Sequence, residues 1–134
     1  MNIDMIHAAA ARLEGKARKT PLLSSPFLDE IAGRQILIKP ECLQHTGSFK
    51  YRGGYSAISA LNKDQCRAGV IAYSSGNHAQ GVALAARQHD VSAVIIMPND
   101  APSIKISNIK ALGGRVVGYD RDNENREDIG TKLA

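Results

Sequence analysis

Residues 70–98 read VIAYSSGNHAQGVALAARQHDVSAVIIMP, and this stretch decides the fold. Residues 70–73 are apolar and are followed by small polar residues, a pattern typical of a buried strand. The alanine-rich residues 79–88 predict a helix, and the β-branched run over residues 91–97 predicts a second strand. A strand, a helix and a strand in this order predict two parallel strands joined by a covering helix.

The same alternation continues toward the C-terminus. Residues 103–112 predict another helix and residues 115–119 a third strand, and a last helix is expected to begin near Glu124. We therefore expect an α/β fold of three layers, in which helices cover a parallel sheet.

The first 50 residues follow a less regular pattern. Apolar residues on one face predict an amphipathic helix over residues 3–13. Ser25 followed by Pro26 predicts the start of a short helix that ends at Gly33. Residues 35–38 then predict a strand.

A lysine among small residues is the first sign of chemistry. Lys50 lies in the run TGSFKYRG, residues 46–53, at the start of a predicted helix, and its amine is the group that forms a Schiff base with a carbonyl cofactor. A lysine taken alone is most often a surface residue. Here, Thr46 to Ser48 are expected to place exposed amides and hydroxyls beside the amine, and Phe49 offers an apolar face to a ring.

Two glycines follow the lysine within the predicted helix. Gly53 and Gly54 each cost a helix about 1 kcal/mol relative to alanine. We therefore expect another backbone or a ligand to approach closely at these positions.

A second polar loop, SSGNH at residues 74–78, lies between a predicted strand and a predicted helix. Free amides at a helix N-terminus bind carboxylates or phosphates, and the carboxyl ends of parallel strands are where such sheets bind ligands. Taken alone, this loop also fits an ordinary cap and turn, and His78 a surface residue. Together with Lys50, the loop predicts a site for pyridoxal phosphate (PLP) and for the carboxylate of an amino acid.

The order and spacing of the two motifs resemble those of the fold-type II PLP enzymes, and within them the serine/threonine dehydratases (threonine ammonia-lyases) and serine racemases. The resemblance runs through nearly the whole chain. Further matching residues are Thr20, Pro21, Leu22, Lys39, Pro40, Glu41, Gln44, Gly81, Met97, Pro98 and Lys105. The related cysteine and threonine synthases usually have threonine after the asparagine, so His78 after Asn77 favours the dehydratase branch.

This resemblance assigns roles to individual residues. It implies that Lys50 binds the cofactor and, once freed by substrate, removes the α-proton. Asn77 would hydrogen-bond the ring hydroxyl of the cofactor, and Phe49 would pack beside the ring. The residues implied to hold the substrate are Ser74, Ser75, Gly76, Asn77 and His78.

Two further residues bear on specificity. Ser75 stands where many threonine dehydratases have alanine and where racemases have serine, so its hydroxyl is a candidate second proton carrier opposite Lys50. Arg126 is similar in place to an arginine that approaches dicarboxylate ligands in some relatives, although an exposed residue at a helix start fits it as well. If Arg126 binds substrate, 3-hydroxyaspartate joins serine and threonine as a candidate.

The resemblance also implies how the chain is divided. Residues 1–52 would begin the large cofactor-binding domain, and residues 53–134 would form most of a smaller α/β domain cut at its C-terminal end. The glycine-rich phosphate loop, the partner of the pyridine nitrogen and the acidic ligands of an activating divalent cation would lie beyond Ala134, so no metal ligand is assigned here. We therefore expect this chain alone to be inactive and its parent enzyme to be a homodimer. The alternatives are a non-catalytic module that binds amino-acid carboxylates, and an unrelated α/β domain.

Composition argues against several classes of function. The net charge of +4 comes from 17 basic residues dispersed among 13 acidic ones, and four Tyr and two Phe without Trp offer little for bases to stack on. This argues against nucleic-acid binding. Cys42 and Cys66 stand alone, which fits reduced thiols better than a disulfide or a zinc site. Without a signal sequence or a spanning segment, a cytoplasmic location away from membranes is expected.

Overall fold

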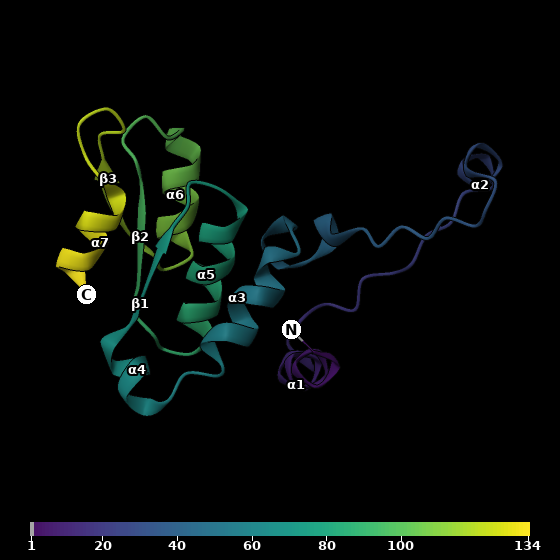
Figure 1. Ribbon diagram of the computed structural model, residues 1–134, viewed down its shortest axis with the longest axis horizontal. Coiled ribbons are helices and arrows are strands. Elements are labelled where there is room, and N and C mark those ends of the chain that lie inside the picture. Colours follow the sequence, from purple (N-terminus) through teal and green to yellow (C-terminus); the bar gives the residue numbers. More distant parts are fainter. Residues whose placement is uncertain (1) are drawn as a thin grey trace.

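The computed structural model describes residues 2–134, and a three-stranded parallel sheet forms its centre (Figure 1). Strands β1 (Val70–Tyr73), β2 (Ala93–Pro98) and β3 (Arg115–Tyr119) lie side by side in that order. Both pairings are parallel. The predicted parallel sheet is confirmed, and β3 has its predicted bounds, whereas β2 begins at Ala93 and not at Val91.

Helices cover both faces of this sheet. Helices α5 (Asn77–Gln88) and α6 (Ser103–Ala111) lie on one side of the strands, and α7 (Arg126–Leu133) lies on the other (Figure 1). α5 contacts β1 and β2, α6 contacts β3, and α7 contacts β2. The three layers expected from the sequence are therefore confirmed.

The middle strand and α5 supply much of the core. Ile95 and Met97 of β2 have at most 1% of their surface exposed, as do Ala79, Ala83 and Ala86 of α5. A strand covered on both faces reads as a continuous apolar run, and alanine lets the covering helix approach closely. The loop that enters α5 therefore connects the sheet to a helix that packs closely against it.

Helix α3 (Lys50–Ile58) crosses α5 where each helix has a glycine. A Cβ added to Gly54 would lie 3.0 Å from the carbonyl carbon of Gly81, and one added to Gly81 would lie 2.9 Å from the carbonyl carbon of Lys50. The two backbones thus touch without a side chain between them. The close backbone approach predicted for Gly54 is confirmed, whereas a Cβ on Gly53 would face open space.

The N-terminal part forms helix α1 (Ile3–Leu13), which contacts α3, and then a long arm, residues 20–44 (Figure 1). Helix α2 (Pro26–Ala32) lies at the far end of the arm. The returning half ends in two short 3-10 helices, η1 (Glu41–Leu43) and η2 (His45–Gly47), which lead into α3.

The arm corrects one prediction from the sequence. Residues 35–38 form no strand; a single antiparallel bridge joins Ile38 to Leu23, with backbone N–H to O distances of 2.8 and 2.9 Å. A short apolar run needs a neighbouring strand to pair with. Within the arm, this run lies beside the outgoing half of the same arm, and the two halves pair at Leu23 and Ile38.

Two helix boundaries depend on asparagine caps. Helix α4 (Lys63–Ala68), which periodicity did not predict, begins with a capping box in which Asn62 accepts from the amide of Gln65 at 2.9 Å and Gln65 accepts from the amide of Asn62 at 2.9 Å. Helix α7 begins at Arg126, slightly later than expected, because the side chain of Asn125 caps it.

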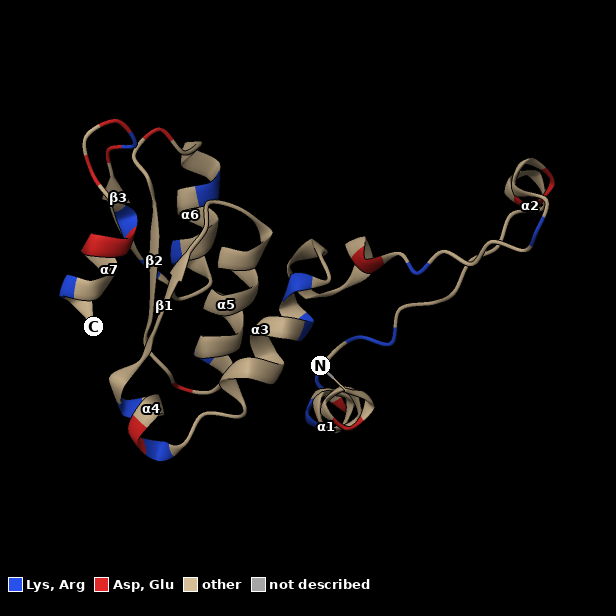
Figure 2. Cartoon of the chain, in the orientation of Figure 1, with Lys and Arg blue, Asp and Glu red and all other residues tan. Residues whose placement is uncertain are grey.

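Charges are spread over the molecule. Lysine and arginine occur on most helices, and acidic residues mark the loops that follow β2 and β3 (Figure 2). Among residues 2–134, no helix has the length and apolar character that crossing a membrane requires.

Candidate active site

The first turn of α3 presents Lys50 between two anchored neighbours. Tyr51 is fully buried, and its hydroxyl donates to Gln88 Oε1 of α5 at 2.8 Å. Arg52 pairs with Glu41 of the arm, with Nε 2.7 Å from Oε2. Lys50 itself is exposed, and its Nζ lies 4.9 Å from the centre of the Phe49 ring.

The loop before Lys50 has an unusual backbone. Thr46 has φ 59° and Gly47 has φ 70°, both in the left-handed region, where threonine is strained. Ser48 is only 6% exposed, and the hydroxyl oxygens of Thr46 and Ser48 have no hydrogen-bond partner among the described residues. The expectation of exposed hydroxyls beside the amine is thus wrong for both Thr46 and Ser48, whose hydroxyl oxygens are buried.

The second loop connects the end of β1 to the start of α5. The amide of Ser74 donates to the carbonyl of Ile96 at 3.2 Å, which extends the sheet by one bond, and the amide of Gly76 donates to Ser74 Oγ at 3.2 Å. Gly76 caps α5 without a side-chain bond, and α5 begins at Asn77. The first amides of α5 have no partner within the helix and are available to an anion.

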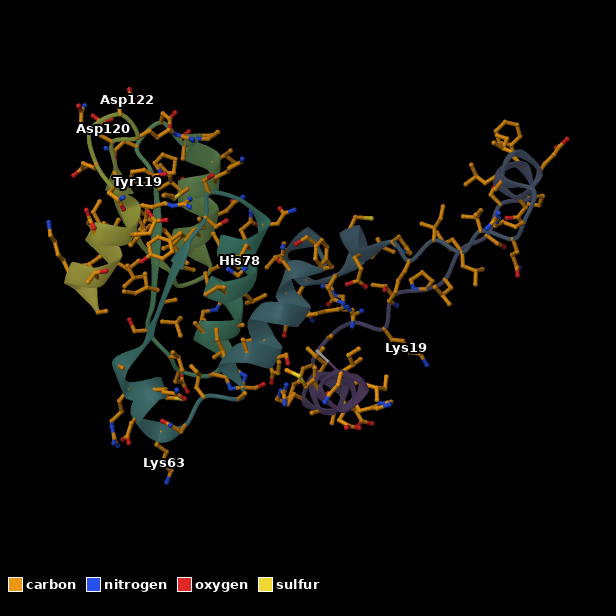
Figure 3. All side chains as sticks on the ribbon, viewed as in Figure 1. Lys19, Lys63, His78, Tyr119, Asp120 and Asp122 are labelled. Carbon is orange, nitrogen blue, oxygen red and sulfur yellow. The ribbon has the colours of Figure 1, made fainter. Side chains whose placement is uncertain are left out.

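A hollow of about 640 Å³ joins the two motifs. Phe49 and Lys50 border it from the start of α3, His78 borders it from α5, and the apolar residues of β1 form its wall. His78 lies on the side of α5 that faces α3 (Figure 3). The volume is in the range of small-molecule sites. The structure therefore brings Phe49, Lys50 and His78 to one place.

A second, more polar hollow of about 290 Å³ lies at the carboxyl edge of the sheet. Three predicted residues of the loop, Ser74, Ser75 and Gly76, border it together with Arg126. Arg126 donates from Nε to Glu127 Oε1 at 2.9 Å, and this hydrogen bond raises the pKa of the guanidinium. Of the predicted residues, Asn77 alone borders neither hollow within residues 2–134; it is exposed, and it follows Gly76 of the second hollow and precedes His78 of the first.

Tyr73 separates the two hollows and borders both. The guanidinium carbon of Arg126 lies 5.9 Å from the centre of the Tyr73 ring. The tyrosine hydroxyl occupies the space that a side chain at Gly130 of α7 would fill. Helix α7 therefore holds Tyr73 in place from the opposite face of the sheet.

Among the residues that border this second hollow, three with polar side chains were not predicted from the sequence: Tyr73, Tyr119 and Arg121. Tyr119 ends β3, beside α7, and Arg121 follows it (Figure 3). Their signal was present, because the rule that ligands bind at the carboxyl ends of parallel strands applies to β3 as well as to β1.

Known proteins are similar to this chain in sequence. A family model described as pyridoxal-phosphate dependent enzyme matches residues 13–134. An L-threo-3-hydroxyaspartate ammonia-lyase from a Pseudomonas species is 53% identical over 94% of this chain and 40% of its own length. A serine racemase from Oryza sativa subsp. indica is 42% identical over 98% of the chain and 39% of its own length.

Solved structures are also similar to this chain. Serine racemase from Dictyostelium discoideum superimposes with a TM-score of 0.94 at 36% identity, over 99% of this chain and 43% of that one. The processed form of threonine deaminase isoform 2 from Solanum lycopersicum gives 0.85 at 36% identity, over 98% and 40%. The chain thus spans about 40% of the length of these relatives. Because the family model matches residues 13–134, this chain belongs to the pyridoxal-phosphate dependent enzymes.

Proposed function

We propose that this chain carries the lysine and the carboxylate-binding loop of a PLP-dependent ammonia-lyase. The reaction would be β-elimination from a hydroxy amino acid, with L-serine, L-threonine and 3-hydroxyaspartate as candidate substrates and a 2-oxo acid and ammonia as products. The observation that carries the proposal is that Lys50 and His78, from different helices, border one hollow beside the amide-rich loop of residues 74–76. The names of the relatives, an ammonia-lyase and a threonine deaminase among them, support β-elimination as the class of reaction.

The residues around the first hollow fit a pyridine ring. Lys50 supplies an amine, Phe49 an apolar ring, and Gly53 open space where a side chain would stand. When bound, PLP supplies an aldehyde that an amine can attack and a ring that withdraws electrons from the α-carbon. Phe49, Lys50 and Asn77 would hold this group.

The protein side of the chemistry is orientation and proton transfer. Lys50 would carry the α-proton on Nζ, because its amine is the basic group that borders the hollow from α3. The loop residues and the first amides of α5 would fix the substrate carboxylate. They would thereby set which face of the amino acid the amine meets.

The chain covers about 40% of its relatives, so we propose that the active site is completed by polypeptide outside these residues. In this division, residues 1–52 belong to the larger cofactor-binding domain, and residues 53–134 belong to the smaller one. Phosphate binding, any divalent cation and a dimer interface would come with the remainder. To test this, the full-length protein and this chain are incubated separately with PLP and each candidate amino acid, and 2-oxo acid release is measured. Full turnover by the chain alone would contradict the division. Binding of substrate without turnover by the full-length protein would favour the non-catalytic binding module.

Ser75 tests whether the site also racemises. Ser75 borders the second hollow and Lys50 the first, and in racemisation the Ser75 hydroxyl would exchange a proton with the other face of the α-carbon. In Ser75→Ala we expect serine racemisation to fall by about a hundredfold or more while β-elimination is largely kept. D-serine and pyruvate measured in the same reaction give both rates. Equal losses of the two products would contradict this role.

Arg126 tests whether the substrate has a second carboxylate. It borders the polar hollow next to Ser75, where a charge-assisted hydrogen bond to a distal carboxylate would act. We expect Arg126→Ala to lower kcat/KM for 3-hydroxyaspartate about tenfold and to leave that for serine unchanged. Arg67→Ala is the matched control, because Arg67 is an exposed arginine on α4 that pairs with Asp64 of the same helix and borders neither hollow among the described residues. An unchanged preference between the two substrates would remove Arg126 from the site.

A further inference from the structure

A polar cluster joins the arm to the first turn of α3, two positions after Lys50. Arg52 makes a two-point pair with Glu41, from Nε to Oε2 at 2.7 Å and from Nη2 to Oε1 at 2.8 Å. The same Nη2 donates to the carbonyl of Arg18 at 3.1 Å, and the Thr20 hydroxyl donates to Glu41 Oε1 at 2.6 Å. Three segments that are distant in sequence therefore meet at one side chain of α3.

Gln44 completes the cluster from the interior. It is 2% exposed, its Oε1 accepts from the amides of Arg18 at 2.9 Å and His45 at 3.0 Å, and its Nε2 donates to the carbonyl of Arg18 at 2.9 Å. Lys39 Nζ donates to the carbonyl of Thr20 at 2.9 Å. Gln44, Lys39 and Arg52 bond to backbone groups, and Glu41 joins Arg52 to Thr20, so the network holds both halves of the arm in one arrangement.

The acid of this cluster stays charged over the working range of a protein. The hydrogen bond from Arg52 is the largest cause that lowers the pKa of Glu41 to about 2, and the Thr20 hydroxyl and the charge of Lys39 act in the same direction against desolvation. The Glu41 side chain is 16% exposed and that of Arg52 29%, so water reaches the pair only in part.

The geometry of the first turn links this cluster to the amine. Each helical residue turns the chain by about 100°, so the side chains of Lys50 and Arg52 leave the helix roughly 200° apart. Between them, Tyr51 is fixed in the core by its bond to Gln88. Arg52 thus fastens the turn to the arm, and Tyr51 fastens it to α5. The side that bears Lys50 is left facing the hollow.

We propose that Glu41 and Arg52 are a positioning pair that fixes the rotation of the first turn of α3 and so directs the Lys50 amine into the hollow shared with Phe49 and His78. Neither residue borders that hollow among the described residues; both act through Lys50. The proposal rests on the role of Lys50 proposed above.

The test measures the reactivity of individual amines and needs no turnover. The full-length protein is mixed with PLP, quenched with borohydride at a series of times, digested and analysed by mass spectrometry to give a modification rate for each lysine. Lys63 serves as an internal standard because it is an exposed lysine at the first position of another helix, α4. In the wild type we expect Lys50 to react faster than Lys63.

Two variants break the pair in different ways. Glu41→Gln removes the charge, and Arg52→Lys keeps it but cannot make the two-point pair. In both, we expect the rate at Lys50 relative to Lys63 to fall about 10- to 100-fold, the effect of displacing a reacting group by about 1 Å. Arg52→Lys carries the test by itself if Glu41→Gln does not fold.

Arg12→Met is the matched control. Arg12 donates from Nε and Nη2 to Ser56 Oγ at 3.2 and 3.1 Å, so this variant also removes an arginine contact to α3, but farther along the helix. We expect it to lower the urea midpoint of unfolding without changing the ratio of Lys50 to Lys63. A wild-type ratio in folded Arg52→Lys, or an equal fall in Arg12→Met, would overturn the positioning role. If Lys50 reacts no faster than Lys63 in the wild type, the proposed role of Lys50 itself fails, and the positioning role falls with it.

Discussion

Replacing Lys50 by alanine is expected to abolish covalent fixation of PLP and to slow 2-oxo acid release from hydroxy amino acids about a thousandfold or more. The size follows from the two tasks that we assign to one amine, holding the cofactor and transferring the α-proton, since acid–base catalysis alone contributes about 10²- to 10⁴-fold. Mass spectrometry of the borohydride-reduced protein measures the first effect. A coupled assay of 2-oxo acid measures the second.

Lys63→Ala is the control for this experiment, because Lys63 has the same place in its helix and is exposed, but lies away from the hollow at α4 (Figure 3). It should retain both fixation and turnover. Added methylamine should restore part of the turnover of Lys50→Ala, since a small amine can enter the space left by the side chain. Undiminished turnover in Lys50→Ala would refute the proposed function.

The second large effect is expected at Gly81. In Gly81→Ala the new Cβ would lie 2.9 Å from the carbonyl carbon and oxygen of Lys50 and 3.0 Å from the amide nitrogen of Tyr51, and backbone cannot turn aside as a long side chain can. We expect α3 and α5 to separate at this point. The free energy of unfolding should fall by about 1 to 3 kcal/mol, in part offset by the better helix propensity of alanine. Urea unfolding measures the change.

Gly53→Ala is a control that is expected to raise the free energy of unfolding. It makes the same substitution in α3, but its Cβ meets nothing within 4 Å, so the gain in helix propensity of up to about 1 kcal/mol should appear undiminished. In the amine-labelling assay, the modification rate of Lys50 should also be lower in Gly81→Ala, because the new Cβ strains the peptide group of Lys50. Equal stability of the two alanine variants would show that the helix crossing is looser than the structure indicates.

The sheet domain was predictable because its signals are local. Residues 115–119 combine β-branched residues with a glycine stop before them, and the alanine-rich α5 follows a loop of helix-starting residues, so strand and helix periods are distinct. The strand predicted at residues 35–38 failed for the opposite reason. Its apolar run is real, but strand formation depends on a partner that composition does not reveal.

The two motifs of the candidate site could be predicted from the sequence, but the shape of the surface that they form could not. The sequence places Lys50 and residues 74–78 at the starts of helices that follow irregular loops, and the helix crossing then brings the two together. It does not reveal that Tyr73 divides the region into two hollows. That division depends on a glycine of α7 that is distant in sequence, and single-sequence periodicity carries no information on such contacts.

The crossing of α3 and α5 also bears on how such a chain can diverge. Where two helices are spaced by interlocking side chains, each substitution in the core shifts their separation slightly. Here the spacing beside Lys50 is set by main-chain atoms, and it stays the same as long as Gly54 and Gly81 remain glycine. Substitutions at the rim of the hollow can therefore change substrate preference over evolutionary time while the span from amine to loop stays constant.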